Sequence, residues 1–323
     1  MSTHRHELPM QIICVRLLTM DNLVLDQSGG SLAQLPQIQR ERLSYIEFRL
    51  YFLGKVGRQD LKDRFGVAPA AATRDFAEYK RLAPNNINFD NASKMYVIAT
   101  EFVPLFEHVP ERALTALTQG FGDGVNAIAG SLVPCEAPPI LNRLNVAILA
   151  PITRAIYSKK AVRISYFSGT SGSSQREIVP FALASDGLRW HTRAFDRKSN
   201  SFRDFVISRM DDATLLEQST PAKQELPEQD IQWNRIVELD LVPHPGRKSP
   251  ELVKRDYAMV DGVFHLKIRA AMAGYVLRQW HVDCSPDHRI SDEAFRLWLS
   301  DPLALYGVGS ALFAPGYEHP KTS

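Results

Sequence analysis

The sequence predicts a multidomain α+β protein with a winged helix-turn-helix near its N-terminus, a small β-barrel in the middle and a small α+β domain at the end. Three observations lead to this fold class. Helical periodicity followed by a hairpin pattern occupies residues 39–104, short strand patterns separated by turn residues fill 159–220, and strand and helix patterns mix in 235–323. A chain of 323 residues is long enough for two or three such domains.

The remaining stretches connect these domains. Residues 1–38 form an N-terminal extension, residues 105–158 a largely helical connector with a long helix at 141–157, and residues 221–234, which are polar and contain proline, a linker. In the C-terminal domain we expect strands at VELDLV and VFHLKIRA and a helix at 291–299.

Composition places the chain among globular proteins but does not indicate a partner. Hydrophobic residues make up 45% and charged residues 23%, and the net charge is only +2. The apolar stretches fall short of the roughly 18 residues that a membrane span needs, so we expect a cytoplasmic protein without a membrane partner. The three cysteines lie far apart without a CxxC pair, and we therefore expect neither disulfides nor a metal or other cofactor.

The N-terminal domain shows the element order of a winged helix-turn-helix. Apolar residues recur at helical spacing in 40–54, a short helix at 58–65 is closed by Gly66, and a further helix runs from Pro69 to about Arg81. The segments INFD and MYVI then read as two strands around a polar turn.

The helix that begins at Pro69 is expected to read DNA. Its inner face carries Ala72, Phe76 and Tyr79, and its outer face enters the major groove. Residues 36–82 contain ten basic and six acidic side chains, an excess that favours phosphate contact, although a solvated helix face gives a similar count. The predicted DNA contacts, including one at the start of the preceding helix and one on the hairpin, are Arg58, Pro69, Ala70, Thr73, Arg74 and Lys94.

The predicted barrel is rich in arginine. It has four strand patterns, at 161–169, 176–184, 188–197 and 201–210, and residues 161–209 contain seven arginines and one lysine, Lys198. Strand alternation places Arg189, His191 and Arg193 on one face and Trp190 on the other, where we expect it in the core. An arginine-lined face suits phosphates and bases, but a half-exposed sheet whose arginines pair with Asp196 and Asp204 is the alternative.

Two parts of the sequence resemble known families. The segment LKDRFGVAPAAATRDFAEY resembles the helix-turn-helix of DeoR-like regulators, except that Ala68 stands where those have serine or threonine. The segment YKRLAPNNINFDNASKMYV is similar to WYL regulators of the CapW/BrxR type, which lie beside bacterial phage-defence operons. The segments ISYFSG, QREIVPFAL and GLRWHTRAFDRKSNSFRDFVISRM resemble a WYL domain, with Trp190-His191-Thr192 in place of Trp-Tyr-Leu.

The resemblance implies a ligand-responsive regulator. It implies an Sm-like or SH3-like β-barrel whose ligand is a nucleotide, a cyclic oligonucleotide or a single-stranded nucleic acid, bound by Tyr166, Ser168, His191, Arg193, Arg203 and Arg209. The C-terminal domain resembles the WCX extension of such proteins and would form a homodimer that binds an inverted repeat in double-stranded operator DNA. The implied function is repression of a phage-defence or stress operon, and the alternative is an activator or a nucleic-acid sensor that modulates a partner enzyme.

An enzymatic function is not expected. His281, Asp283, Cys284 and His288 lie close together, but their spacing matches no known metal-ligand pattern. The sequence also lacks a GxxxxGK[ST] phosphate loop and an HExxH motif.

Overall fold

A computed structural model describes residues 32–121, 131–138, 141–170 and 172–319, which divide into two compact units, Met1–Ala137 and Pro138–Ser323. Most of the predicted N-terminal extension, residues 1–31 with Cys14, lies outside the described residues. None of the described helices is long and apolar enough to cross a membrane.

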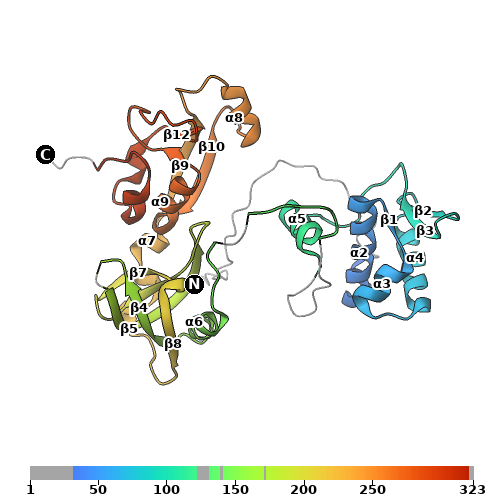
Figure 1. Ribbon diagram of the computed structural model, residues 1–323, viewed down its shortest axis with the longest axis horizontal. Coiled ribbons are helices and arrows are strands. Elements are labelled where there is room, and N and C mark those ends of the chain that lie inside the picture. The colour runs from blue at the N-terminus through green and yellow to red at the C-terminus, as the bar shows by residue number, and fades with distance from the viewer. Residues whose placement is uncertain (1–31, 122–130, 139–140, 171, 320–323) are drawn as a thin grey trace, which may run out of the picture. The chain divides into compact units, whose positions relative to one another are not determined.

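The first unit confirms the predicted helix-turn-helix order and the wing (Figure 1). Helix α2 (Gln37–Leu53) begins three residues before the predicted start, while α3 (Arg58–Phe65) and α4 (Pro69–Leu82) follow the prediction closely. Strands β1 (Lys55–Val56), β3 (Met95–Ile98) and β2 (Ile87–Asp90) form an antiparallel sheet in that order, and α5 (Pro110–Gln119) follows the sheet.

Glycines and a proline set these boundaries. Gly54 ends α2 and Gly66 ends α3, both with the positive φ that glycine adopts at low cost. Pro69 occupies the first turn of α4, where its missing N–H is not needed. Leu43, Ile46 and Leu50 of α2 are fully buried in the core of this unit, as their spacing predicts.

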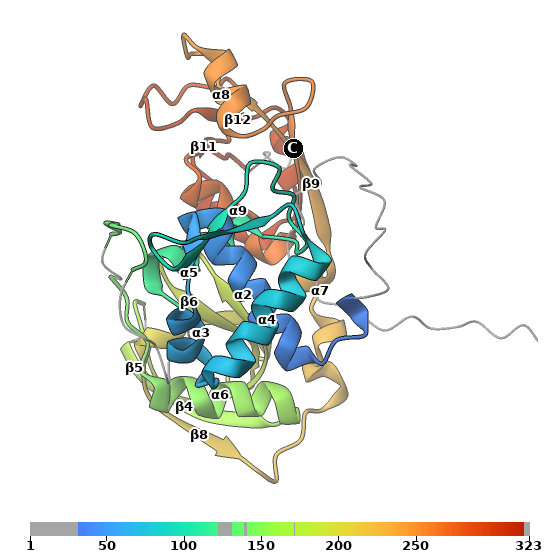
Figure 2. The ribbon, with the colours of Figure 1, turned by 90° about the vertical axis from the view of Figure 1, so that its right-hand side faces the viewer.

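The connector contains less helix than expected. Helix α6 (Val146–Ser158) starts five residues after the predicted 141, because the side chain of Asn145 caps it by accepting a hydrogen bond from the Ala147 amide at 2.9 Å. Helix α6 lies against strands of the following sheet (Figure 2).

The central sheet has five antiparallel strands in the order β7-β6-β5-β4-β8. They are β4 (Ala161–Ser168), β5 (Gly172–Ser185), β6 (Trp190–Asp196), β7 (Ser201–Val206) and β8 (Met210–Leu216). The 3-10 helix η1 (Ile207–Arg209) joins the two edge strands, β7 and β8. The four steps from Val206 to Met210 reach at most about 14 Å, whereas a flat five-stranded sheet is about 19 Å wide, so the sheet must curl.

Packing inside the sheet agrees with this curl. The ring of Tyr166 on β4 contacts that of Phe205 on β7 at a centroid distance of 5.1 Å, and its hydroxyl accepts a hydrogen bond from the Val206 amide at 3.4 Å. Backbone pairing between β7 and β8 is absent from the described strands, so these five strands form a curled open sheet, and the Sm-like barrel stays a prediction.

The C-terminal domain combines a four-stranded sheet, β10-β9-β12-β11, with helices. Its elements are α7 (Ile231–Asn234), β9 (Ile236–Pro243), α8 (Pro250–Asp256), β10 (Phe264–Arg269), α9 (Ala270–Gln279), β11 (Val282–Asp283) and β12 (Leu297–Leu299). The predicted helix at 291–299 is wrong. Leu297 and Leu299 are buried while Trp298 is only partly so, and this period of two belongs to β12, which pairs with β9.

Candidate DNA interface and ligand face

The reading helix α4 is held in place by its inner face. Phe76 is almost fully buried and stacks on Tyr96 of the wing strand β3, with ring centroids 4.0 Å apart. On the same helix, the buried Asp75 accepts hydrogen bonds from Arg42 of α2, the shorter at 2.6 Å. These contacts fix α4 against both the wing and the first helix of the unit.

A buried glutamate extends this support to the segment after the wing. Each carboxylate oxygen of Glu47 accepts two hydrogen bonds. Oε2 accepts them from the Tyr79 hydroxyl at 2.9 Å and the Leu105 amide at 2.8 Å. Oε1 accepts one from the Phe106 amide at 2.8 Å and lies 3.1 Å from Nε2 of His108. Burial and the neighbouring Glu47 charge raise the pKa of Tyr79.

The charge count from the sequence did not distinguish buried from exposed acids. Glu47 and Asp75 contribute two of the six acidic side chains of residues 36–82, but both are buried and paired. The exposed surface of the helix-turn-helix is therefore more basic than the count indicates.

The outer face of α4 is open to solvent. Pro69, Ala70, Thr73 and Arg74 are all exposed. The first turn of the helix contains no acidic residue, and Ala68 at the N-cap supplies no side-chain hydrogen bond, as the comparison with DeoR-like regulators indicates. Pro69 has no N–H, and the Ala71 and Ala72 amides bond to the Ala68 carbonyl, so the Ala70 N–H is the group of this turn that is left for a phosphate.

The side chains on this face differ in whether they already make a hydrogen bond or an ion pair. The Thr73 hydroxyl donates to the Pro69 carbonyl at 3.0 Å, which leaves its oxygen able to accept only. Within the described residues Arg74 makes no ion pair, so its guanidinium is available for a phosphate or a base.

The other two predicted DNA contacts are also exposed. Arg58 begins α3, with its guanidinium 6.0 Å from the Tyr96 ring centroid. Lys94 lies at the tip of the β2–β3 hairpin, in the left-handed backbone region with φ of 58°.

The six predicted ligand residues fall into two groups. Tyr166, His191 and Arg193 are buried, with exposed fractions of 7%, 4% and 6%. Ser168 is half-buried, and Arg203 and Arg209 are exposed. These three make few hydrogen bonds to other side chains. Arg203 donates to the Ser201 hydroxyl at 3.3 Å, and Ser168 shares a hydrogen bond with Thr170 at 3.1 Å.

Arg193 is enclosed by carboxylates. Its Nε and Nη2 donate to the two oxygens of Asp230 at 2.7 and 3.1 Å, and its Nη1 lies 3.1 Å from Asp204. Burial lowers the pKa of Arg193, but the hydrogen bond with Asp230 and the charges of both carboxylates outweigh burial and raise it overall. An anionic ligand at Arg193 would compete with these partners.

His191 belongs to a second buried cluster. Its Nε2 lies 3.1 Å from Asp186, and its Nδ1 has no hydrogen-bond partner among the described residues. Burial raises the pKa of Asp186, but amide and side-chain donors, chiefly the backbone N–H groups of Arg189 and Leu188, lower it to about 2. Asp186 is a site residue that sequence reasoning missed, since Ser-Asp-Gly reads only as a turn.

Helix α9 packs against both clusters. The Tyr275 hydroxyl donates to Asp204 at 3.4 Å, and the Tyr275 ring lies 5.4 Å from that of His191. Arg278 lies 3.7 Å from Asp186. The face that carries His191 and Arg193 is therefore covered by α7 and α9 of the C-terminal domain.

The motif Trp190-His191-Thr192 does not follow the predicted alternation. Trp190, expected in the core, is 46% exposed. Thr192 is fully buried and its hydroxyl donates to the Ala182 carbonyl at 3.1 Å. Because both faces of β6 are covered beyond Trp190, the period of two does not separate inside from outside on this strand.

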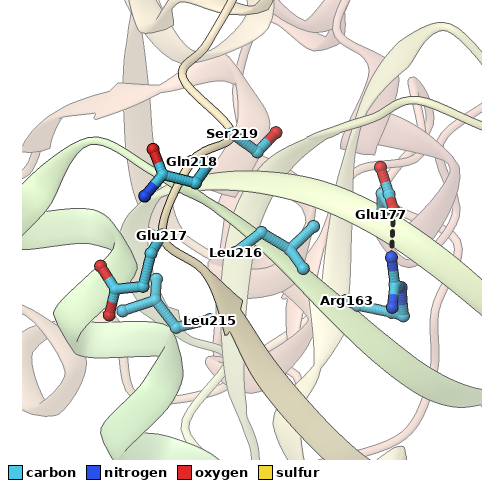
Figure 3. A pocket seen from close by; sticks show the side chains of 7 residues that line it. All are labelled: Arg163, Glu177, Leu215, Leu216, Glu217, Gln218 and Ser219. Carbon is cyan, nitrogen blue, oxygen red and sulfur yellow. Dashed lines mark hydrogen bonds and ion pairs between the residues drawn. The ribbon is translucent and has the colours of Figure 1, made fainter.

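A shallow hollow on the central sheet lies away from these residues (Figure 3). It is lined by the ion pair of Arg163 with Glu177, at 3.0 Å, and by residues 215–219 at the end of β8. Its lining contains none of the six predicted ligand residues.

The cluster of His281, Asp283, Cys284 and His288 has a structural explanation. Asp283 is buried and accepts hydrogen bonds from the Ser285 amide and hydroxyl and from the Ile290 amide, with His244 Nε2 at 3.1 Å. The Ser285 hydroxyl thus donates to the carboxylate rather than to a histidine. Burial raises the pKa of the Cys284 thiol, which makes it a poor nucleophile.

Three family models match the chain. The BrxR transcriptional regulator winged helix-turn-helix domain matches residues 39–119, the WYL domain residues 147–215, and the BrxR transcriptional regulator C-terminal dimerization domain residues 236–305. The matches follow one another in the order that the sequence resemblance implies.

Relatives match across the domains. The chain is 32% identical to the DNA-binding transcriptional repressor CapW of Escherichia coli (strain KTE188) over 280 residues, which covers 84% of this chain and 91% of that protein. It is 33% identical to CapW of Stenotrophomonas maltophilia over 80% of this chain and 88% of that protein. A solved structure, proteasome accessory factor B/C of Arthrobacter aurescens, is 17% identical with a TM-score of 0.26, and the match covers 82% of this chain and 45% of that one.

The domain matches and the two CapW relatives agree on one assignment. The identity exceeds 30% across most of both chains, and the winged-helix, WYL and C-terminal dimerization models account for the three described folding regions. The chain therefore belongs to the CapW/BrxR family of WYL-domain transcriptional regulators.

Proposed function

We propose that this protein is a DNA-binding transcriptional repressor that acts as a homodimer on an inverted repeat. The observation that carries the proposal is the outer face of α4, where Thr73 and Arg74 are exposed beside an acid-free helix start while the inner face is locked to α2 and the wing. Arg58 and Lys94 add exposed positive charges near the start of α3 and at the wing tip. The relatives named as repressors support this direction of regulation.

A gel shift on the DNA upstream of its own gene tests the proposal. Arg74→Ala should weaken operator binding by about 1–3 kcal/mol, the usual contribution of one arginine that contacts a base. Arg255→Ala is the matched control, because it removes another exposed arginine, from α8 of the C-terminal domain. Equal affinities of both variants and the wild type would refute the assignment of α4 as the reading helix.

We further propose that an anionic ligand at the WYL sheet releases the operator, and that the operon controlled serves phage defence or stress. Arg203 and Arg209 are exposed and Ser168 is half-buried, so these three would make the first contacts, while Tyr166, His191 and Arg193 are buried. A ligand that empties a nearly full operator needs about 10⁴-fold preference for the released state. The double variant Arg203→Ala/Arg209→Ala should keep operator binding and lose release by the ligand.

The Sm-like shape of the sensor domain belongs to the same proposal. The three-residue connection through η1 and the register shifts in β4 and β5 support a sheet that bends toward closure. Arg203 of β7 and Arg209 of η1, both exposed, lie on consecutive elements of this bent sheet.

An activator, or a sensor that modulates a partner enzyme, is the second candidate. This candidate rests on the same exposed arginines as the repressor, but it predicts the opposite change in expression when the gene is deleted. Deleting the gene should raise expression from its promoter if the protein represses and lower it if the protein activates.

A further inference from the structure

Residues 221–234, which the sequence presents as a linker, pack on the central sheet. We call these residues the strap. The strap contains the 3-10 helices η2 (Lys223–Glu225) and η3 (Pro227–Gln229) and helix α7. Two of its acidic side chains, Glu225 and Asp230, are buried, with exposed fractions of 5% and 2%. A flexible linker would leave such carboxylates in water, so the strap binds at a defined position on the sheet.

The first contact lies at the end of β6. Nε of Arg197 donates to Oε1 of Glu225 at 2.7 Å, and Nη2 donates to Oε2 at 2.9 Å. Glu225 also accepts a hydrogen bond from the Ala222 amide at 2.8 Å, which fixes the carboxylate within the strap.

The second contact repeats this geometry four residues earlier on β6. Arg193 donates through Nε and Nη2 to both oxygens of Asp230. The Asp230 carboxylate also caps α7 by accepting from the amides of Gln232 and Trp233, at 3.1 and 3.2 Å. Both carboxylates are thus held by the strap backbone and presented to an arginine fork.

The strap occupies the donors that a phosphodiester chain would use. Arg193 and Arg197 are four residues apart along the strand direction, a separation of about 13 Å. A bidentate carboxylate uses the same two parallel N–H bonds of arginine that a phosphate uses. Two forks this far apart match a ligand with several phosphates in a row better than a mononucleotide.

We propose that the strap is an internal acidic substitute for the ligand, in which Glu225 and Asp230 occupy Arg197 and Arg193 until a phosphodiester chain displaces them. This inference deepens the proposed ligand response and rests on it. Because the strap ends with α7 and leads directly into β9, its displacement would alter how the C-terminal domain attaches to the sensor sheet. Trp233 of α7 reports on that attachment, since its ring lies 5.6 Å from Phe181 and 4.7 Å from the Arg269 guanidinium.

The test removes the two charges and keeps the shapes. Glu225→Gln/Asp230→Asn retains on each side chain one oxygen that can accept from the strap amides of Ala222, Gln232 and Trp233. The other oxygen becomes an N–H₂ group that faces the Nε–H of Arg197 or Arg193, so each arginine loses one bond of its fork and the charge assistance of the other. Labelled oligothymidylate and cyclic di-AMP are the probes, and fluorescence anisotropy measures binding. Weakening two internal competitors should tighten binding of at least one probe about tenfold or more.

Glu238→Gln is the matched control. It removes the same kind of charge from an exposed pair with Lys267, in which both side chains are about 70% exposed, and should change affinity by less than about twofold. The two probes separate a linear from a cyclic source of the phosphodiester, because only the linear strand can extend along β6.

Hydrogen exchange of the wild-type chain supplies a second readout that needs no variant. Saturating oligothymidylate or cyclic di-AMP should speed exchange at the Ala222, Gln232 and Trp233 amides, which lose their carboxylate partners. A strap that stays protected with a probe bound would overturn the inference, as would a folded double variant that binds both probes no more tightly than Glu238→Gln. Should the double variant unfold, Glu225→Gln alone and the exchange data decide.

Failure of the strap and failure of the proposed function give different results. Absence of binding by both probes to every variant overturns the strap inference but leaves the operator gel shift intact. Loss of operator binding in the wild type overturns the repressor proposal, whatever the probes do.

Discussion

Replacing Glu47 with glutamine should destabilise the winged-helix unit by about 2–4 kcal/mol. Each carboxylate oxygen of Glu47 serves two partners, so the amide group of glutamine must face one of these two sets. If the N–H₂ group takes the place of Oε2, the Tyr79 hydroxyl can turn to accept from it, but the Leu105 amide loses its acceptor. If the N–H₂ group takes the place of Oε1, the ring nitrogen of a neutral His108 can accept from it, but the Phe106 amide loses its acceptor. Either orientation leaves one buried N–H unsatisfied, at about 1–3 kcal/mol, and removes charge assistance from the rest.

Hydrogen exchange at the amides of α2 and α4 measures this change within one unit of the chain. Glu111→Gln is the matched control, since Glu111 is exposed in the first turn of α5 and its loss should cost no more than about 0.5 kcal/mol. An opening free energy for Glu47→Gln equal to that of Glu111→Gln would refute the idea that this carboxylate organises the unit.

Three further predictions concern other parts of the chain. Asp186→Asn should lose up to about 2 kcal/mol of stability at neutral pH. Because the folded-state pKa of Asp186 is lowered from 3.8 to about 2, this contribution is present above pH 4 and fades as the pH falls toward 2, so urea unfolding of variant and wild type should converge there. Gly274→Ala should unfold the C-terminal domain at a markedly lower temperature, because a Cβ would lie 1.8 Å from the Ser310 carbonyl oxygen, whereas Gly169→Ala meets no atom within 4 Å and should melt like the wild type. Lys94→Ala should weaken operator binding on all sequences alike and reduce the salt dependence of binding by about one phosphate contact, and an unchanged salt slope would exclude Lys94 from the interface.

Local signals predicted the N-terminal unit well. Gly66 and Pro69 bracket the turn between α3 and α4, and each acts through its own backbone geometry, so the neighbouring sequence suffices to place both helix ends. The helix expected at 291–299 failed for the opposite reason. Asp292 and Glu293 suit a helix start, but pairing with β9, more than fifty residues earlier in the chain, makes the segment's end a strand.

The ligand face was harder to predict because its partners are distant in sequence. The resemblance drew attention to His191 and Arg193, but not to Asp230, which lies 37 residues after Arg193 in a segment whose composition reads as a linker. Trp190 was misplaced because alternation assigns a side chain to a face but does not show where the cover of that face ends, and Trp190 is the first residue of β6, outside the covered stretch. Which residues bear the ligand contacts stays a prediction.

The surroundings of Arg193 decide how ligand sensing can be examined. Arg193→Ala would leave the buried carboxylates of Asp204 and Asp230 without their cation, and breaking a buried pair from one side costs about 3–5 kcal/mol. A loss of response in that variant would therefore mix ligand binding with folding. The exposed Arg203 and Arg209 lack this double role, so their removal isolates the ligand contact. For the same reason, ligand binding at Arg193 would loosen the C-terminal domain. A phosphate that binds the Arg193 guanidinium must displace Asp230, which caps α7.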